Sequence, residues 1–159
     1  MSLPYKKLIL HGGLHKMIRH PYWEKSLSNK FQEWSGKKFV WGKSDCCIFA
    51  GDCIESMTSV NPMNNFIHKY AHDKYKTKKE ALSLIKNSFN DLPSCIEKVL
   101  GKPKNINFAK RGDLVLFASG QYSHICGIVN LSGSKITALS LKQGLVEFPL
   151  SDGHLSWEI

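Results

Sequence analysis

The chain has 159 residues, of which 42% are hydrophobic and 22% are charged, a balance typical of one globular domain and unlike that of a disordered or fibrous protein. No apolar run approaches the roughly 20 residues that a membrane-spanning helix needs, so we expect no membrane insertion. The formal net charge of +9 would attract polyanions such as nucleic acid or anionic cell-wall polymer. The basic residues are spread along the chain, however, and a solvated basic surface accounts for them without nucleic-acid binding.

Residues 1–20 carry lysines around a short Leu8–Leu10 apolar core. Three apolar residues are too few for the hydrophobic region of a secretory signal, so we expect the chain to fold in the cytoplasm, where it is made. Delivery to a cell wall or incorporation into a virion tail would then use another route. We expect one domain over residues 1–159, with 1–20 as an N-terminal extension.

The five cysteines are an odd number, which excludes a fully paired disulfide scaffold within one chain and favours reduced thiols. No Cys-x-x-Cys pair occurs, which argues against a zinc or iron–sulfur site. His68 and His72 have the spacing of metal ligands on a helix, but no carboxylate or cysteine at ligand spacing joins them. No phosphate loop or dinucleotide fingerprint is present, and we expect neither a metal nor a cofactor.

Helices are expected between residue 23 and about residue 100. Apolar residues recur at helical spacing over 23–34, and Gly36 suits the C-terminal cap of that helix. Thr77 and Glu80 form a capping box for a later helix. A shorter helix is expected within residues 91–101, between an Asp-Leu-Pro start and a terminal glycine.

From about Lys110 onward, short apolar or β-branched runs alternate with turns that contain glycine and serine, which is typical of an antiparallel meander. The expected strands are Leu114–Phe117, Ile125–Val129, Ile136–Leu141 and Leu145–Phe148. Helices followed by a sheet predict an α+β fold, in which N-terminal helices pack on an antiparallel β-sheet formed by the C-terminal half.

The segment Gly42–Ile48 is the most informative part of the chain. It places Cys46 just after a polar turn, in the first turn of a helix that Asp45 or Ser44 can cap. Unpaired N–H groups and the helix dipole favour negative charge there, which biases a thiol toward the nucleophilic thiolate. Backbone N–H groups around Cys46 and Cys47 could stabilise an oxyanion. In the opposing interpretation both cysteines are small buried hydrophobic residues, as free cysteines usually are.

His124 is the candidate base, because it opens the second expected strand while the other six histidines lie outside the sheet. A cysteine that opens a helix and a histidine on a distant strand are the minimal equipment of a papain-like thiol hydrolase. Alternatively, His124 is a surface or packing histidine. Cys47 is a rival nucleophile, but its side chain is expected about 100° around the helix from Cys46, so that only one of them can face the sheet.

Several short motifs, taken in order, resemble the NlpC-type papain-like peptidases of the bacterial cell wall. Phe39–Gly42 followed by Asp45–Cys46 is similar to the family's aromatic-x-Trp-Gly … Asp-Cys-Ser-Gly signature. Arg111–Phe117 is similar to its Pro-Gly-Asp-Leu-Val-Phe-Phe strand. His124 before Gly127–Val129 resembles its His-Val-Gly-Ile segment.

A divergent branch of that family, common in phage and prophage tail clusters, resembles the chain more closely over residues 20–159. The features shared with this branch are Cys46–Cys47, Asn61–Pro62, Arg111–Asp113, Gly144–Leu145, Pro149–Leu150 and Trp157. By this resemblance the protein would be associated with phage-tail proteins.

The resemblance implies that Cys46 is the nucleophile and His124 the base of a cysteine peptidase or amidase. Such an enzyme would hydrolyse an amide bond through an acyl-thioester, with the peptide stems of peptidoglycan as the expected substrate. Asp45 and Cys47 would support the oxyanion at the helix start. The third, orienting residue usually lies on the next strand, where Thr137 is nearest by spacing and Ser140 second.

Three positions depart from the family pattern. His124 lies three residues before Gly127 instead of two, so either a β-bulge absorbs the extra residue or the side chain turns to the other face. Cys47–Ile48 stands where the family has Ser-Gly, and Phe39 where it often has tyrosine. A second interpretation therefore stays open: a catalytically inactive NlpC-like structural component of a phage or prophage tail.

Overall fold

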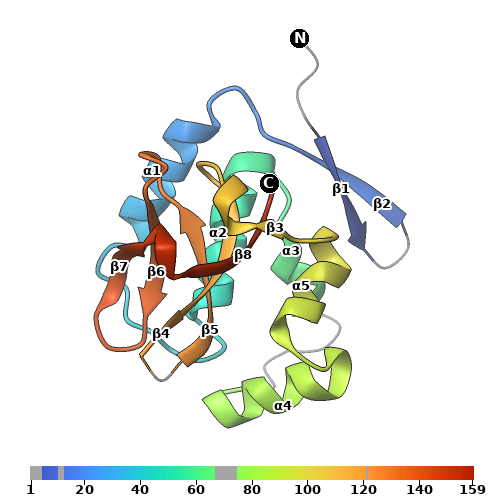
Figure 1. Ribbon diagram of the computed structural model, residues 1–159, viewed down its shortest axis with the longest axis vertical. Coiled ribbons are helices and arrows are strands. Elements are labelled where there is room, and N and C mark those ends of the chain that lie inside the picture. The colour runs from blue at the N-terminus through green and yellow to red at the C-terminus, as the bar shows by residue number, and fades with distance from the viewer. Residues whose placement is uncertain (1–4, 11–12, 67–74, 121) are drawn as a thin grey trace.

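A computed structural model describes residues 5–10, 13–66, 75–120 and 122–159 of the chain (Figure 1). The fold is α+β, and its helices precede a six-stranded antiparallel sheet, which confirms the expected fold class at this level. Within the described ranges, no helix combines the length and the apolar character that crossing a membrane requires.

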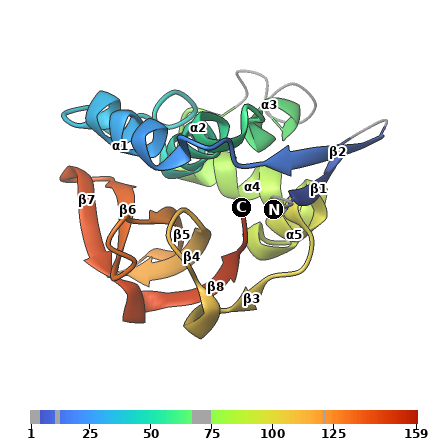
Figure 2. The same cartoon turned by 90° about the horizontal axis from the view of Figure 1, so that it is seen from above.

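The N-terminal segment contains a β-hairpin that the sequence analysis did not anticipate. Strand β1 (Tyr5–Leu10) pairs antiparallel with β2 (Gly13–Ile18) in a two-stranded sheet of its own. The hairpin extends beside the helices in Figures 1 and 2, and β1 lies against α5. Met17, near its end, is buried in the main core, so this segment is attached to the rest of the fold.

The helices are α1 (Trp23–Trp34), α2 (Cys46–Thr58), α3 (Pro62–Phe66), α4 (Lys78–Phe89) and α5 (Leu92–Leu100). Helices α1, α2, α4 and α5 follow the expected pattern and caps, whereas the short helix α3 was not expected. Gly36, just past α1, adopts a φ of +83°. Thr77 Oγ1 accepts a hydrogen bond from the Glu80 N–H at 3.2 Å, and Asp91 Oδ1 accepts one from the Ser94 N–H at 2.8 Å. Because these side chains satisfy N–H groups at helix starts, α4 and α5 begin where the sequence predicts.

The sheet has the order β3-β8-β4-β5-β6-β7. Its strands are β3 (Lys104–Asn105), β4 (Leu114–Ser119), β5 (Tyr122–Val129), β6 (Lys135–Ser140), β7 (Gly144–Pro149) and β8 (Gly153–Trp157). Two 3₁₀ helices, η2 (Ile106–Phe108) and η3 (Leu150–Asp152), precede β4 and β8. The predicted meander β4 to β7 is confirmed, and β8 returns to pair with the free side of β4.

Helix α2 packs between α1 and the sheet, where it contacts β5 and β6. Its buried stripe includes Phe49, Cys53 and Met57, which join Ile128 of β5 in the larger hydrophobic cluster. The other face of the sheet has a smaller cluster that includes Phe117, and Figure 2 shows the strands curving around this side. The start of α2 is thus held against β5, which positions the site described below.

Asp113 at the start of β4 anchors three parts of the chain. Its carboxylate is 1% exposed and forms an ion pair with Arg19 at 3.0 Å. It also accepts hydrogen bonds from the N–H groups of Lys110 at 2.9 Å and of Ile159 at 3.3 Å. Burial raises the pKa of Asp113, while these hydrogen bonds and the neighbouring cations act in the opposite direction. The Arg-Gly-Asp motif is therefore a structural anchor in this fold.

Candidate active site

The turn before α2 has a shape that only glycine suits at its centre. Val40 and Ser44 form an isolated antiparallel bridge across it, and Gly42 adopts a φ of +75°. A Cβ atom at Gly42 would clash with the backbone carbonyl of Tyr75. The Gly42 N–H donates to Asp45 Oδ2 at 3.1 Å, so the turn leads directly into the helix cap.

Asp45 is the N-cap of α2 and lies buried beneath the turn. Its Oδ1 accepts the Ile48 N–H at 3.0 Å, and its Oδ2 accepts the Tyr75 hydroxyl at 2.6 Å. Burial raises the pKa of Asp45, and the neighbouring Cys46 raises it further. Burial also raises the pKa of Tyr75, so the hydroxyl stays protonated as a donor. Asp45, which we expected to support the oxyanion, fixes the helix start through these contacts.

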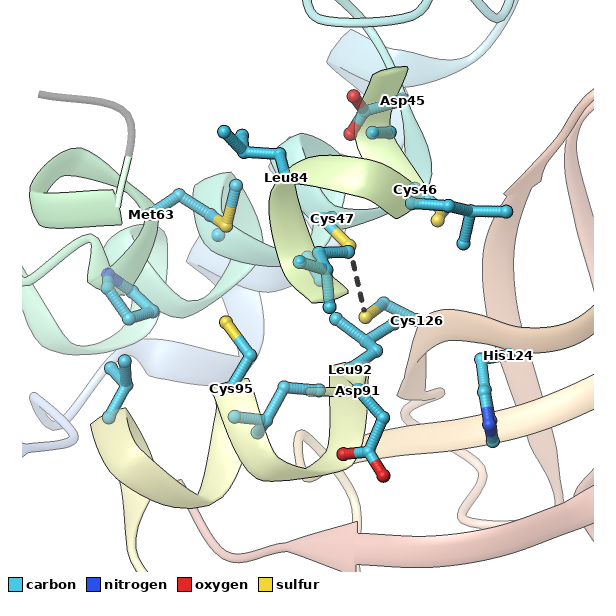
Figure 3. A pocket seen from close by; sticks show the side chains of 18 of the residues that line it. Asp45, Cys46, Cys47, Met63, Leu84, Asp91, Leu92, Cys95, His124 and Cys126 are labelled. Carbon is cyan, nitrogen blue, oxygen red and sulfur yellow. Dashed lines mark hydrogen bonds between the residues drawn. The ribbon is translucent and has the colours of Figure 1, made fainter. Parts of the chain in front are cut away.

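Three sulfur atoms meet where α2 faces the sheet. Cys46 and Cys47 occupy the first turn of α2 and are both half-buried, and Cys126 of β5 is buried opposite them. The sulfur atoms of Cys47 and Cys126 are 3.4 Å apart (Figure 3). The expectation that only one of the two adjacent cysteines can face the sheet does not hold, because both interact with Cys126.

The cluster favours one thiolate, on Cys46. Hydrogen bonds from the thiols of Cys126 and Cys47 hold the pKa of Cys46 well below its ordinary value, and backbone hydrogen bonds at both residues add to this. Interactions with Cys126 and Cys46 raise the pKa of Cys47 well above the ordinary value, and the interaction with Cys46 together with burial does the same for Cys126. The Cys47 and Cys126 thiols thus stay protonated next to a third sulfur at a helix N-terminus.

His124 lies on β5 two residues before Cys126, at the edge of the same cavity. Phe117 pairs with Ile125 but Ser119 with Tyr122, so β5 has an extra residue next to His124. The register shift thus places a β-bulge at this position. The side chain is exposed, and within the described part of the chain no hydrogen bond joins its ring to a cysteine. In Figure 3 the ring is turned away from the three sulfur atoms, on the side of Asp91.

The two candidates for the third residue lie at other places in the sheet. Thr137 on β6 pairs with Ile128, four residues along β5 from His124, and does not line the cavity. Ser140 Oγ accepts N–H groups in the turn after β6, from Lys142 at 3.3 Å and Gln143 at 3.4 Å. The β5–β6 register thus separates both side chains from His124.

Asp91, the N-cap of α5, is an acidic neighbour of His124 that the sequence analysis missed. Hydrogen bonds from Ser94 lower the pKa of the Asp91 carboxyl, and the charge of His124 lowers it further. Cys126 was missed as well, although the alternation of side chains along a strand places it on the same face as His124. Tyr75 carried no sequence signal, because its contact with Asp45 joins residues 30 positions apart.

The sulfur cluster lies on the wall of a cavity of about 420 Å³. The cavity is bounded by α2, α4 and α5 and reaches His124 and Asp91 on one side. Cys46 is the cysteine of this wall that combines partial exposure with a lowered pKa. Cys95 also lines the cavity, but burial raises its pKa to about 12, so it is a poor nucleophile.

In the described part of the chain, no three His, Cys, Asp or Glu side chains are grouped so that they could hold a metal ion. His68 and His72, considered above as a ligand pair, lie outside the described residues. Cys53 is fully buried in the core, and burial raises its pKa well above the ordinary value.

The sequence model of the family described as "Domain of unknown function (DUF6950)" matches residues 18–159. The match runs from the end of β2 through β8, so it includes every residue of the cysteine cluster and the cavity. No curated protein matches the chain.

Proposed function

The chain belongs to the DUF6950 family of domains of unknown function, and from the geometry of its own site we propose that it is a papain-like, NlpC-type cysteine hydrolase. Cys46 is the nucleophile. The observation that carries this proposal is its position: a half-buried thiol at the N-terminus of α2, on the wall of a cavity, with donors that lower its pKa. A helix packed on an antiparallel sheet, with the cysteine at the helix start, is the architecture that the motif resemblance implies.

In the proposed reaction the Cys46 thiolate attacks the carbonyl carbon of an amide. The C–S bond forms and the C–N bond breaks, and the leaving amine takes a proton from His124. Water then attacks the acyl-thioester, His124 accepts its proton, and the acid and the Cys46 thiolate are released. Backbone N–H groups at the start of α2 stabilise the oxyanion in both steps.

The thiol donors of Cys47 and Cys126 change what His124 has to do. Because they favour the Cys46 thiolate on their own, His124 is needed for the leaving group and the water and not for activating the sulfur. Its exposed position at the cavity edge suits that role. Catalytic hydrogen bonds are often long in free enzymes and shorten when substrate binds, so the absence of a direct contact here is compatible with the role.

The motif resemblance points to an amide in the peptide stems of peptidoglycan. A formal net charge of +9 would hold the protein on anionic wall polymers, at a strength that falls with added salt. Purified sacculi, with mass analysis of the released fragments, test this directly. We expect fragments with the native protein and with Cys53→Ala, whose sulfur is remote from the cavity, and none with Cys46→Ala. Full hydrolysis by Cys46→Ala would overturn the assignment.

One observation favours a second candidate function, an inactive NlpC-like component of a phage or prophage tail. Cys126 occupies the place on β5 that faces Cys46, while His124 is exposed and forms no hydrogen bond with the cysteine. This reading predicts that the native protein and Cys46→Ala are equally inert toward sacculi and toward activated esters. It also predicts that both copurify equally well with tail proteins.

A further inference from the structure

Helix α4 is amphipathic, but its apolar face is not part of either hydrophobic core. None of its twelve residues is buried, and none belongs to the two clusters that hold the fold together. Ala81, Leu84 and Ile85 are half-buried and line the cavity beside the cysteine cluster. A helix of this kind normally buries such a face against a partner, and among the described residues these three side chains of α4 face the cavity.

The facing wall is equally apolar. Leu92, Ile96 and Val99 of α5 line it, and Met63 closes the end away from the sheet (Figure 3). The cavity between the two helices, about 420 Å³ in volume, opens at its other end onto Cys46 and Cys126. It is thus a groove that leads from aliphatic walls to a reactive sulfur.

The polar groups of the groove lie at its margins. Its polar and charged lining residues Lys78, Lys86, Asn90, Asp91 and His124 are exposed. The oxygens of Asp45 are already hydrogen-bonded to the turn and to Tyr75. A bound peptide brings an N–H and a C=O with each residue, and each of these would lose its hydrogen bonds to water against aliphatic walls. A hydrocarbon chain has no such groups and gains free energy from the same burial.

We propose that the acyl group which Cys46 accepts is a fatty acyl group, whose chain lies between α4 and α5 with its carbonyl carbon at the sulfur. This inference rests on the proposed Cys46 hydrolase, and it replaces the peptide stem with a fatty acyl amide or ester as the substrate. A peptide stem is the competing occupant. The reacting bonds are those given above: the C–S bond forms, the C–N or C–O bond breaks, and the leaving group takes the proton.

A series of p-nitrophenyl esters, with acyl groups from acetyl to decanoyl, tests directly whether the groove binds a hydrocarbon tail. The ester bond breaks as the Cys46 thioester forms, nitrophenolate is released, and the adduct appears in the intact mass of the protein. We expect kcat/KM to rise by roughly fourfold for each added methylene until the groove is filled. A rate that is flat or falls with chain length would overturn the inference.

Two substitutions on α4 form a matched pair. Ala81 lines the groove, whereas Ser83 is exposed on the same helix and does not. We expect Ala81→Trp to lower the ratio of decanoyl to acetyl kcat/KM by about tenfold or more, since a bulky ring would occupy the space of the chain. Ser83→Trp should leave both rates unchanged. Equal ratios of decanoyl to acetyl kcat/KM in the two variants would contradict the placement of the acyl chain between α4 and α5.

A binding measurement separates this inference from the proposed function. The Cys46→Ala protein, titrated with cis-parinaric acid, should enhance the probe's fluorescence, and the additional Ala81→Trp substitution should weaken binding. Ester hydrolysis that shows no preference for acyl length, together with no parinarate binding, would contradict the fatty acyl substrate. The proposal that the protein is a hydrolase would still stand. If parinarate binds but the native protein neither forms a thioester nor hydrolyses an ester, the proposed hydrolase function would be contradicted.

Discussion

The sulfur atoms of Cys47 and Cys126 lie 3.4 Å apart and join the first turn of α2 to strand β5. A disulfide needs a sulfur–sulfur distance of about 2.05 Å, so the two atoms must approach by roughly 1.4 Å. Because the Cys46 thiolate beside them would react with diamide first, we predict the coupling for the Cys46→Ala protein: mild oxidation removes two hydrogens by intact mass and gives a Cys47–Cys126 peptide in the digest.

Cys53 provides the internal control for this oxidation, because it is buried in the core, does not line the cavity and should remain a thiol. Cys126→Ser should prevent the crosslink at Cys47. A digest in which Cys47 stays a free thiol while another pair is oxidised would contradict the predicted geometry.

Two aspartates cap helices with similar geometry but different burial. Asp45 at α2 is 3% exposed, and its second oxygen holds the buried Tyr75 hydroxyl, whereas Asp91 at α5 is exposed. Asp91→Ala should cost about 1 kcal/mol of unfolding free energy, the usual value of an N-cap. Asp45→Ala should cost about 2–4 kcal/mol, because the hydroxyl loses its acceptor as well. Urea unfolding measures both, and equal losses would show that the second oxygen contributes nothing.

The pH dependence of the unfolding free energy separates two effects of Asp45: the ionisation of its carboxyl and its hydrogen bonds as the helix cap. Burial raises the pKa of this carboxyl in the folded state above its unfolded value. Its contribution to stability is therefore fully present below the unfolded pKa and is lost as the pH rises through the raised folded pKa. Asp45→Asn keeps an acceptor for the Ile48 N–H without this titration. We predict that Asp45→Asn loses less unfolding free energy than the native protein between acid and neutral pH; identical pH profiles would contradict the raised pKa.

Gly36 and Gly42 both adopt positive φ angles, +83° and +75°, but only Gly42 lies against another part of the chain. Alanine at Gly36 meets no atom within 4 Å and should cost about 1 kcal/mol for the left-handed conformation alone. Alanine at Gly42 would also clash with the Tyr75 carbonyl, which should add about 1–3 kcal/mol. The denaturant midpoints of the two variants test this. Equal midpoints would contradict the close contact between the turn at Gly42 and the Tyr75 carbonyl.

His124 and His154 are both exposed on strands of the same sheet, and only His124 lines the cavity. If His124 serves the leaving group and the water, His124→Ala should lower kcat by about a hundredfold or more, while His154→Ala leaves it unchanged. Turnover should be measured on the substrate that the native protein cleaves fastest. An unchanged rate in His124→Ala, with Cys46→Ala inert, would assign the proton transfers to another group.

Local signals in the sequence predicted most of the regular structure. Thr77 and Asp91 mark helix starts because capping involves residues only a few positions apart, and β4 to β7 follow from alternating runs and turns. The hairpin β1–β2 was missed because lysines interrupt its short apolar runs, and the pairing of β8 with β4 because it joins distant segments.

The candidate site was predictable only where its residues are neighbours in the chain. Asp45 and Cys46 follow from the capped helix start. Cys126 approaches Cys47 across 79 positions, and the bulge beside His124 depends on the register of β5 against β4, neither of which a short motif encodes. Thr137 was chosen by spacing along the chain, but strand pairing places it opposite Ile128.

The pH dependence of alkylation at each cysteine tests the central claim, that Cys46 carries the thiolate of this site. Iodoacetamide labelling, resolved by peptide mass, should show a Cys46 rate that falls much less between about pH 8 and pH 6 than the rate of an ordinary thiol, which slows by about two orders of magnitude. Cys126→Ala should make the Cys46 rate more dependent on pH, since the first-ranked partner of the sulfur is removed, whereas Cys126→Ser keeps a donor there. A Cys46 rate that falls in parallel with the ordinary thiol, or a faster reaction at Cys47, would contradict the assignment.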